Sequence, residues 1–86
     1  MNKLETAFVL VKSKMGHEME VMNDLLKLDG IKEAMGTYGQ YDVLVKVQVP
    51  SRSDVERIIT KEIRAIPNVV STTTLPVIPR QGQNNS

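Results

Sequence analysis

The 86-residue chain carries 11 Lys and Arg against 10 Asp and Glu, has a formal net charge of +1, and contains no cysteine. This length allows one small domain, and the missing cysteine excludes disulfides, thiolate metal sites and a cysteine nucleophile. The balanced charge lacks the basic excess of a nucleic-acid-binding protein, and no apolar run approaches the roughly 20 residues of a membrane span. We expect a cytoplasmic protein that contacts neither nucleic acid directly nor a membrane.

The first 30 residues predict a strand followed by a helix. Residues 6–12 are rich in β-branched and aromatic residues and apolar on both alternating faces, which indicates a strand covered on both sides. Residues 17–28 then follow a helical period, and this helix is expected to end at Asp29-Gly30. The predicted core-facing stripe of the helix contains Met15, Met19, Met22 and Leu26, widened by Val21 and Leu25.

The middle of the chain predicts a β-hairpin. Residues 31–38 show a weaker strand pattern, whereas residues 43–49 carry valine at every second position. Gly39-Gln40 lies between the two segments and is expected to form a tight turn. Pro50 ends the second strand.

Residues 53–66 predict a second helix, and residues 69–75 predict a last strand. The tetrapeptide from Ser53 to Glu56 matches a capping box, in which a serine hydroxyl and a glutamate carboxylate satisfy reciprocal backbone donors. Pro67-Asn68 then stops the helix. Pro76 lacks a ladder donor, so the last strand is expected at an edge of the sheet.

The order of these elements predicts an α+β fold, a ferredoxin-like βαββαβ module with a four-stranded antiparallel sheet. Residues 1–78 form the single domain, and the polar residues 79–86 are expected to form a disordered tail. Both helices lie on one face of such a sheet, which leaves an apolar opposite face uncovered. Because monomers rarely expose a large apolar patch, we expect a homodimer paired through the sheet, a dimeric α/β barrel.

Residues suited to catalysis or metal binding are scarce. His17 is the only histidine, and together with Met15 and Met19 it offers a soft-metal cluster; the favoured interpretation is a solvated helix start beside apolar core residues. No serine lies in a nucleophile turn, and the 5 glycines match no phosphate-binding fingerprint. We therefore expect no enzymatic activity, no metal and no cofactor.

The segment from Gly36 to Asp42 is the most informative part of the sequence. A glycine-containing turn frees backbone N–H groups that can receive a carboxylate, Asp42 can pair with an ammonium group, and Tyr41 adds a flat wall with a hydroxyl. Together these groups could hold a zwitterion such as a free amino acid. The alternative, which physical reasoning alone favours, is a plain hairpin turn in which Asp42 caps its own backbone.

Several motifs follow one another in a recognisable order. They are Gly39-Gln40-Tyr41-Asp42, the alternating valine strand after it, a helix, Ile66-Pro67-Asn68-Val69 and Ser71-Thr72-Thr73-Thr74. From Thr6 to Ile78 this order resembles the effector-binding (RAM) domain of the Lrp/AsnC transcription regulators. Full-length members of that family place a helix-turn-helix domain before this module, whereas only residues 1–5 precede the first predicted strand, so the chain resembles the stand-alone form of the domain.

The resemblance implies a ferredoxin-like dimer that assembles further into rings and binds a small-molecule effector, typically an amino acid, between dimers near the hairpin turn. The ligand-binding residues carried over by position are Gly39, Tyr41, Asp42, Thr72 and Thr74, although the sequence does not decide which alternating threonines face the site. Regulation of transcription is then indirect, through co-assembly with full-length Lrp/AsnC-type regulators or as an amino-acid buffer or sensor.

Two other classes share the βαββαβ order. Cofactor-free enzymes of the dimeric α+β barrel type need a roomy pocket inside one subunit, with polar or aromatic catalytic residues. This chain has no Trp, one Phe and one His, so that supply is small. A purely structural assembly module, or a binding domain of the ACT type, would oligomerise without any ligand response at Gly39 to Asp42.

Overall fold

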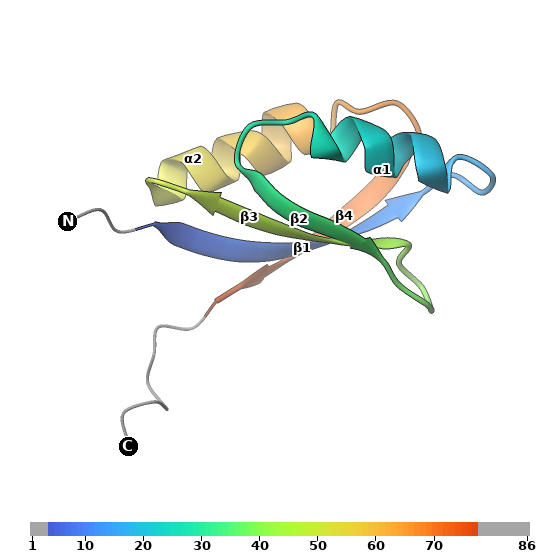
Figure 1. Ribbon diagram of the computed structural model, residues 1–86, viewed down its shortest axis with the longest axis horizontal. Coiled ribbons are helices and arrows are strands. Elements are labelled where there is room, and N and C mark those ends of the chain that lie inside the picture. The colour runs from blue at the N-terminus through green and yellow to red at the C-terminus, as the bar shows by residue number, and fades with distance from the viewer. Residues whose placement is uncertain (1–3, 78–86) are drawn as a thin grey trace, which may run out of the picture.

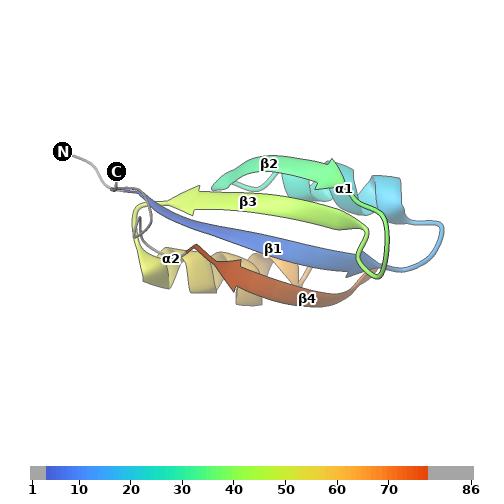
Figure 2. The ribbon, with the colours of Figure 1, turned by 90° about the horizontal axis from the view of Figure 1, so that it is seen from below.

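Four antiparallel strands form one sheet, and the helices cover one of its faces (Figure 1). The structure is a computed structural model and describes residues 4–77. Its elements in chain order are β1 (Glu5–Ser13), α1 (Glu18–Leu26), β2 (Ile31–Gly36), β3 (Val43–Val49), α2 (Arg52–Arg57) with its π-helical continuation η1 (Ile58–Ile63), and β4 (Val69–Pro76). The strand order across the sheet is β2-β3-β1-β4 (Figure 2), so the predicted ferredoxin-like fold with β4 at an edge is confirmed.

The core lies between the helices and the two central strands. Alternate residues of β1 and β3 point into it in register, and Val9 pairs with Val45 while Val11 pairs with Val43. All of these side chains are buried, as the period-2 pattern of the sequence predicts. The helices and the segments after them contribute Val21, Leu25, Val55, Ile58, Ile59, Ile63 and Ile66.

The predicted core stripe around α1 is confirmed at Val21 and Leu25 and in part at Met22, and wrong at Met15, Met19 and Leu26. Met15, Met19 and Leu26 are 89%, 73% and 52% exposed, whereas Val21 and Leu25 are fully buried. Consecutive helical residues lie about 100° apart around the axis, so Leu26 cannot share the face that Leu25 turns to the sheet. Val21 and Leu25 lie four residues apart on this nine-residue helix, so they share one face, and Met22 packs partly buried beside them.

The second helix begins two residues earlier than predicted. Its N-cap is Ser51, whose hydroxyl oxygen accepts a hydrogen bond from the amide nitrogen of Asp54 at 3.1 Å. The helix continues as η1, in which Arg64 donates its amide to the carbonyl of Ile59, five residues earlier, at 3.3 Å. The capping box predicted at Ser53 is therefore wrong.

The hairpin between β2 and β3 is also looser than predicted. Strand β2 ends at Gly36, and the connection is a six-residue loop, residues 37–42, in place of the two-residue turn expected at Gly39-Gln40. This hairpin loop lies at the end of the sheet that is opposite the start of β1 (Figure 2).

The sheet face that no helix covers is apolar in its centre. On this open face Phe8 pairs with Leu75, and Leu10 pairs with Leu44 on the other side of β1. The members of the open-face cluster, all partly or largely exposed, are Phe8, Leu10, Met35, Leu44 and Leu75. An apolar uncovered face is thus confirmed, and pairing of two copies through it stays a prediction.

Two further predictions concern the ends of the chain and membranes. The predicted tail, residues 79–86, lies outside the described residues, so the domain boundary at residue 78 stays a prediction. Over residues 4–77, none of the helices has the length and apolar character needed to cross a membrane.

Candidate functional site

The hairpin loop is closed by hydrogen bonds between its two ends. The amide of Thr37 donates to the carbonyl of Asp42 at 2.9 Å, and the hydroxyl of Thr37 donates to the carbonyl of Tyr41 at 2.8 Å. Gly39 has a φ of +106°, and a Cβ placed there would meet nothing within 4 Å. Glycine is therefore required for the backbone conformation and not for space, and the loop tip stays open to solvent.

Asp42 fastens the loop to the end of β1. Its Oδ2 atom accepts hydrogen bonds from the amide and the hydroxyl of Ser13 at 2.8 and 3.0 Å, and its amide donates to the carbonyl of Val11 at 2.9 Å. The predicted alternative, in which Asp42 caps its own backbone, is not what the geometry shows. Ser13 was missed from the sequence, although its place after Ala7, Val9 and Val11 on the core face of β1 indicates a buried hydroxyl that needs a partner.

Tyr41 connects the loop to β4 across the end of β1. Its hydroxyl lies 2.8 Å from the hydroxyl of Thr73, and Thr73 pairs with Leu10 on the open face. Lys12 adds a second clamp on the loop, donating from Nζ to the carbonyl of Gln40 at 3.2 Å. Gly39, Tyr41 and Asp42 therefore belong to one ordered unit, which also includes Ser13 and Thr73.

Thr72 and Thr74 lie on the other face of β4. They pair with Val11 and Val9, whose side chains point into the core. The hydroxyl oxygen of Thr72 accepts a hydrogen bond from Nε of Arg64 at 3.1 Å, so this threonine is tied to the end of the second helix. Within one subunit the structure does not bring these two threonines together with the hairpin loop, and their role in ligand binding stays a prediction.

His17 has a local partner. Its Nδ1 atom lies 3.0 Å from Oε1 of Glu20, three residues further along the chain, and the His17 side chain is partly exposed while that of Glu20 is largely exposed. In the described part of the chain, no group of three or more His, Cys, Asp and Glu side chains is placed to hold a metal ion.

Comparison with known proteins gives one consistent answer. The sequence profile of the Lrp/AsnC ligand binding domain matches residues 6–84. The HTH-type transcriptional regulator FL11 of Pyrococcus abyssi is 35% identical over 72 residues, which cover 84% of this chain and 47% of that protein. The chain thus spans about half the length of the curated relatives that it matches.

Solved structures agree with the sequence match. The crystal structure of FFRP-DM1 superposes with a TM-score of 0.82 at 40% identity, over 86% of this chain and 99% of that one. The structure of E. coli AsnC superposes with a TM-score of 0.81 at 25% identity, over 91% of this chain and 52% of that one. The similarity therefore covers a complete solved chain in the first case and about half of a longer one in the second.

Proposed function

The chain belongs to the Lrp/AsnC ligand-binding domain family, and from this premise we propose that it binds a small-molecule effector, an amino acid, and regulates transcription through partner proteins. Its homologues are Lrp/AsnC-type transcriptional regulators, a family that is typically oligomeric and binds small-molecule effectors. The proposal extends this family property to a specific place on the chain, the hairpin loop, and to a specific class of effector. A regulator of this kind acts in the cytoplasm.

The observation that carries the proposal is the fixed shape of the hairpin loop. In the described part of the chain, the backbone N–H of Thr37 closes the loop and that of Asp42 donates to Val11 on β1, whereas residues 38–41 donate no backbone N–H to a protein acceptor. Those amides are available to a carboxylate. Asp42 keeps Oδ1 for an ammonium group because only Oδ2 is bonded to Ser13 among the described residues. A carboxylate acceptor beside free amides is the arrangement that suits a zwitterion.

The open face supports assembly with a second copy. At about 25 cal/mol per Å², burying even ~400 Å² of its apolar cluster contributes on the order of 10 kcal/mol before ordering costs are subtracted. Because the hairpin loop lies at one end of the sheet, we expect a dimer formed in this way to leave both loops at its periphery. We propose that the effector binds where the loops of neighbouring dimers meet, and that full-length regulators of the same family join the assembly.

Thermal unfolding against a panel of amino acids tests the effector. An amino acid at 100 times its dissociation constant stabilises the folded protein by about 2.7 kcal/mol, which raises Tm by several degrees. The shift should be selective and should disappear in Tyr41→Phe and Asp42→Asn, the second of which keeps an oxygen for Ser13. Tyr38→Phe is the matched control, because Tyr38 is a fully exposed tyrosine of the same loop. If no amino acid raises Tm, the loop is a structural turn and the proposed effector site is contradicted.

Two other functions, an enzyme and a structural assembly module, are distinguished from the proposed one as follows. The relatives are regulators and not enzymes, and we propose that this chain likewise has no catalytic activity. A structural assembly module would show the oligomer but no ligand response in any of the variants. We also propose that the domain does not contact DNA itself, so a sequence-specific gel shift by the purified chain at physiological salt would contradict the indirect mode of action.

A further inference from the structure

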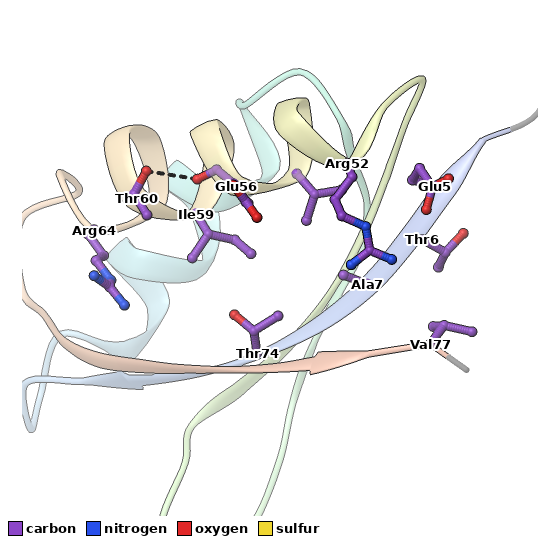
Figure 3. Close-up of a pocket in the computed structure, with 11 residues that line it drawn as sticks. Glu5, Thr6, Ala7, Arg52, Glu56, Ile59, Thr60, Arg64, Thr74 and Val77 are labelled. Carbon is purple, nitrogen blue, oxygen red and sulfur yellow. Dashed lines mark hydrogen bonds between the residues drawn. The ribbon is translucent and has the colours of Figure 1, made fainter. Parts of the chain in front are cut away.

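A cleft lies away from the hairpin loop, between the second helix and β4. This α2–β4 cleft has a volume of about 310 Å³ and is walled by α2, η1, β4 and the start of β1 (Figure 3). Its volume falls at the small end of the range of roughly 300–1,000 Å³ that is typical of ligand pockets. No residue of the loop lines it, although Thr74, one of the threonines that the family resemblance assigns to ligand binding, does.

The floor of the cleft is apolar. Ala7, Val55 and Ile59 line it and are only 4%, 8% and 5% exposed, because their side chains also belong to the core. Val77 adds an apolar side chain at the mouth, and Thr74 points from β4 into the space below Ile59 (Figure 3). An aliphatic group bound here would be removed from water along most of its length.

One end of the cleft is cationic and preorganised. The guanidinium of Arg64 points toward β4 and donates from Nε to the hydroxyl of Thr72 at 3.1 Å (Figure 3). Over residues 4–77, no carboxylate oxygen lies within 4.0 Å of it. Its terminal nitrogens are therefore available for a bidentate contact with a carboxylate, the geometry for which arginine is best suited.

The helix wall has an unusual conformation at this place. Arg64 directly follows η1, and its amide reaches back to the carbonyl of Ile59 in a π-helical hydrogen bond. Such turns are frequently found at functional sites. Here the π turn places Ile59, Thr60 and Arg64 along the wall of the cleft.

The other end of the cleft has mixed charge. Arg52 lies there with its guanidinium toward Ala7, and the carboxylate-bearing side chains of Glu5 and Glu56 lie near it (Figure 3). Eight helical residues separate Glu56 from Arg64, about 12 Å along the axis. A free amino acid bound to Arg64 would thus place its ammonium beside a guanidinium, with the acidic side chains at the far end. An α-ammonium group is disfavoured at the cationic end.

We propose that the α2–β4 cleft binds an aliphatic monocarboxylate that lacks an α-ammonium group. Its carboxylate lies on the terminal nitrogens of Arg64, within reach of the Thr74 hydroxyl, and its short tail covers Ile59 and Ala7. The site discriminates against amino acids, whereas the hairpin loop selects them. The two ligand classes therefore do not compete for one site.

Isothermal titration of the intact protein with 4-methylpentanoate tests this inference. Leucine shares its branched tail and adds the ammonium, and 4-methylpentanamide keeps the tail but removes the charge. We expect the carboxylate to bind about tenfold or more tightly than the amide and than leucine at this site. Arg64→Gln should remove that preference, whereas Lys61→Gln, a matched loss of positive charge on η1 outside the cleft, should leave the affinity unchanged.

Two more variants separate this site from the loop and from a folding defect. Thr74→Phe fills the cleft from an exposed strand position and keeps both arginines, so it should abolish 4-methylpentanoate binding while the Tm is retained. Asp42→Asn should leave that binding intact. Equal affinity for the amide, or equal loss in Lys61→Gln and Arg64→Gln, would overturn the inference. An amino-acid response at the loop without any 4-methylpentanoate binding would overturn this inference alone and leave the proposed function standing.

Discussion

Asp42 and Ser13 form a two-bond junction between the hairpin loop and β1. One oxygen of the carboxylate accepts from both the amide and the hydroxyl of Ser13, which is 5% exposed. The junction holds the loop at a fixed place on the sheet. Asp42, which the sequence predicts to bind a ligand, therefore also stabilises the fold. Its variants must separate these two roles.

Removing the carboxylate of Asp42 should destabilise the fold more than removing the hydroxyl of Ser13. Asp42→Ala leaves a buried amide without its acceptor and is expected to lower the free energy of unfolding by about 2 kcal/mol. Ser13→Ala removes one hydrogen bond and should cost about 1 kcal/mol. Urea unfolding at one fixed protein concentration measures both. If Ser13→Ala proves the more damaging change, the amide bond to Asp42 is not the main contact.

The two serines at the start of α2 should differ in their contribution to stability. Ser51 caps the helix, so Ser51→Ala is expected to lower the free energy of unfolding by about 1 kcal/mol. Ser53 lies inside the first turn and is exposed, so Ser53→Ala should stay within about 0.5 kcal/mol of the parent. Chemical denaturation of the two variants side by side decides between the observed cap and the one predicted from the sequence pattern.

Two glycines with positive φ should respond differently to alanine. At Gly30, where φ is +93°, a Cβ would lie 2.7 Å from Cγ1 of Val49 and 2.8 Å from Cδ1 of Ile58. Gly30→Ala therefore combines a crowded core with the roughly 1–2 kcal/mol penalty of a left-handed conformation, and we expect the larger drop in Tm. Gly39→Ala meets only the conformational penalty because its surroundings are open. Similar drops in Tm for the two variants would contradict this account.

A charge in the centre of the open face should break the predicted dimer. Leu10 lies on β1 between Leu44 and Thr73, so Leu10→Glu would bury a carboxylate against the second copy. Light scattering should then give a mass near 9.6 kDa, whereas the parent should give at least twice that value. Met19→Glu is the control, since Met19 is exposed on α1 away from this face. A parent protein that is already monomeric would rule out pairing through the sheet.

The two central strands were predictable because each is determined by its own residues. The period-2 valines of β3 and the apolar alternation of β1 mark the buried face directly, and the register then follows from the core. The face of α1 was not predictable in the same way. Apolar residues occupy several of its sides, and only contact with the sheet selects Val21 and Leu25 over the methionines.

The sequence predicted the loop residues of the candidate site but not the distant residues that they contact. Asp42 and Ser13 are 29 residues apart, and Tyr41 and Thr73 are 32 apart, so no local pattern links them. The N-cap of the second helix was predicted at the wrong serine for another reason. Two overlapping serine-to-acid spacings, Ser51 to Asp54 and Ser53 to Glu56, satisfy the same rule, and the chain uses the one directly after Pro50.

Strand β4 touches both candidate sites through consecutive residues. Thr73 bonds Tyr41 of the loop on one face, and Thr72 bonds Arg64 of the cleft on the other. Strand β4 therefore connects the hairpin loop, where we propose that amino acids bind, with the α2–β4 cleft, where we propose that their deaminated analogues bind. If a ligand in the cleft changes the affinity of the loop for an amino acid by some factor, the amino acid must change the affinity of the cleft for its ligand by the same factor, because linkage between two binding equilibria is reciprocal.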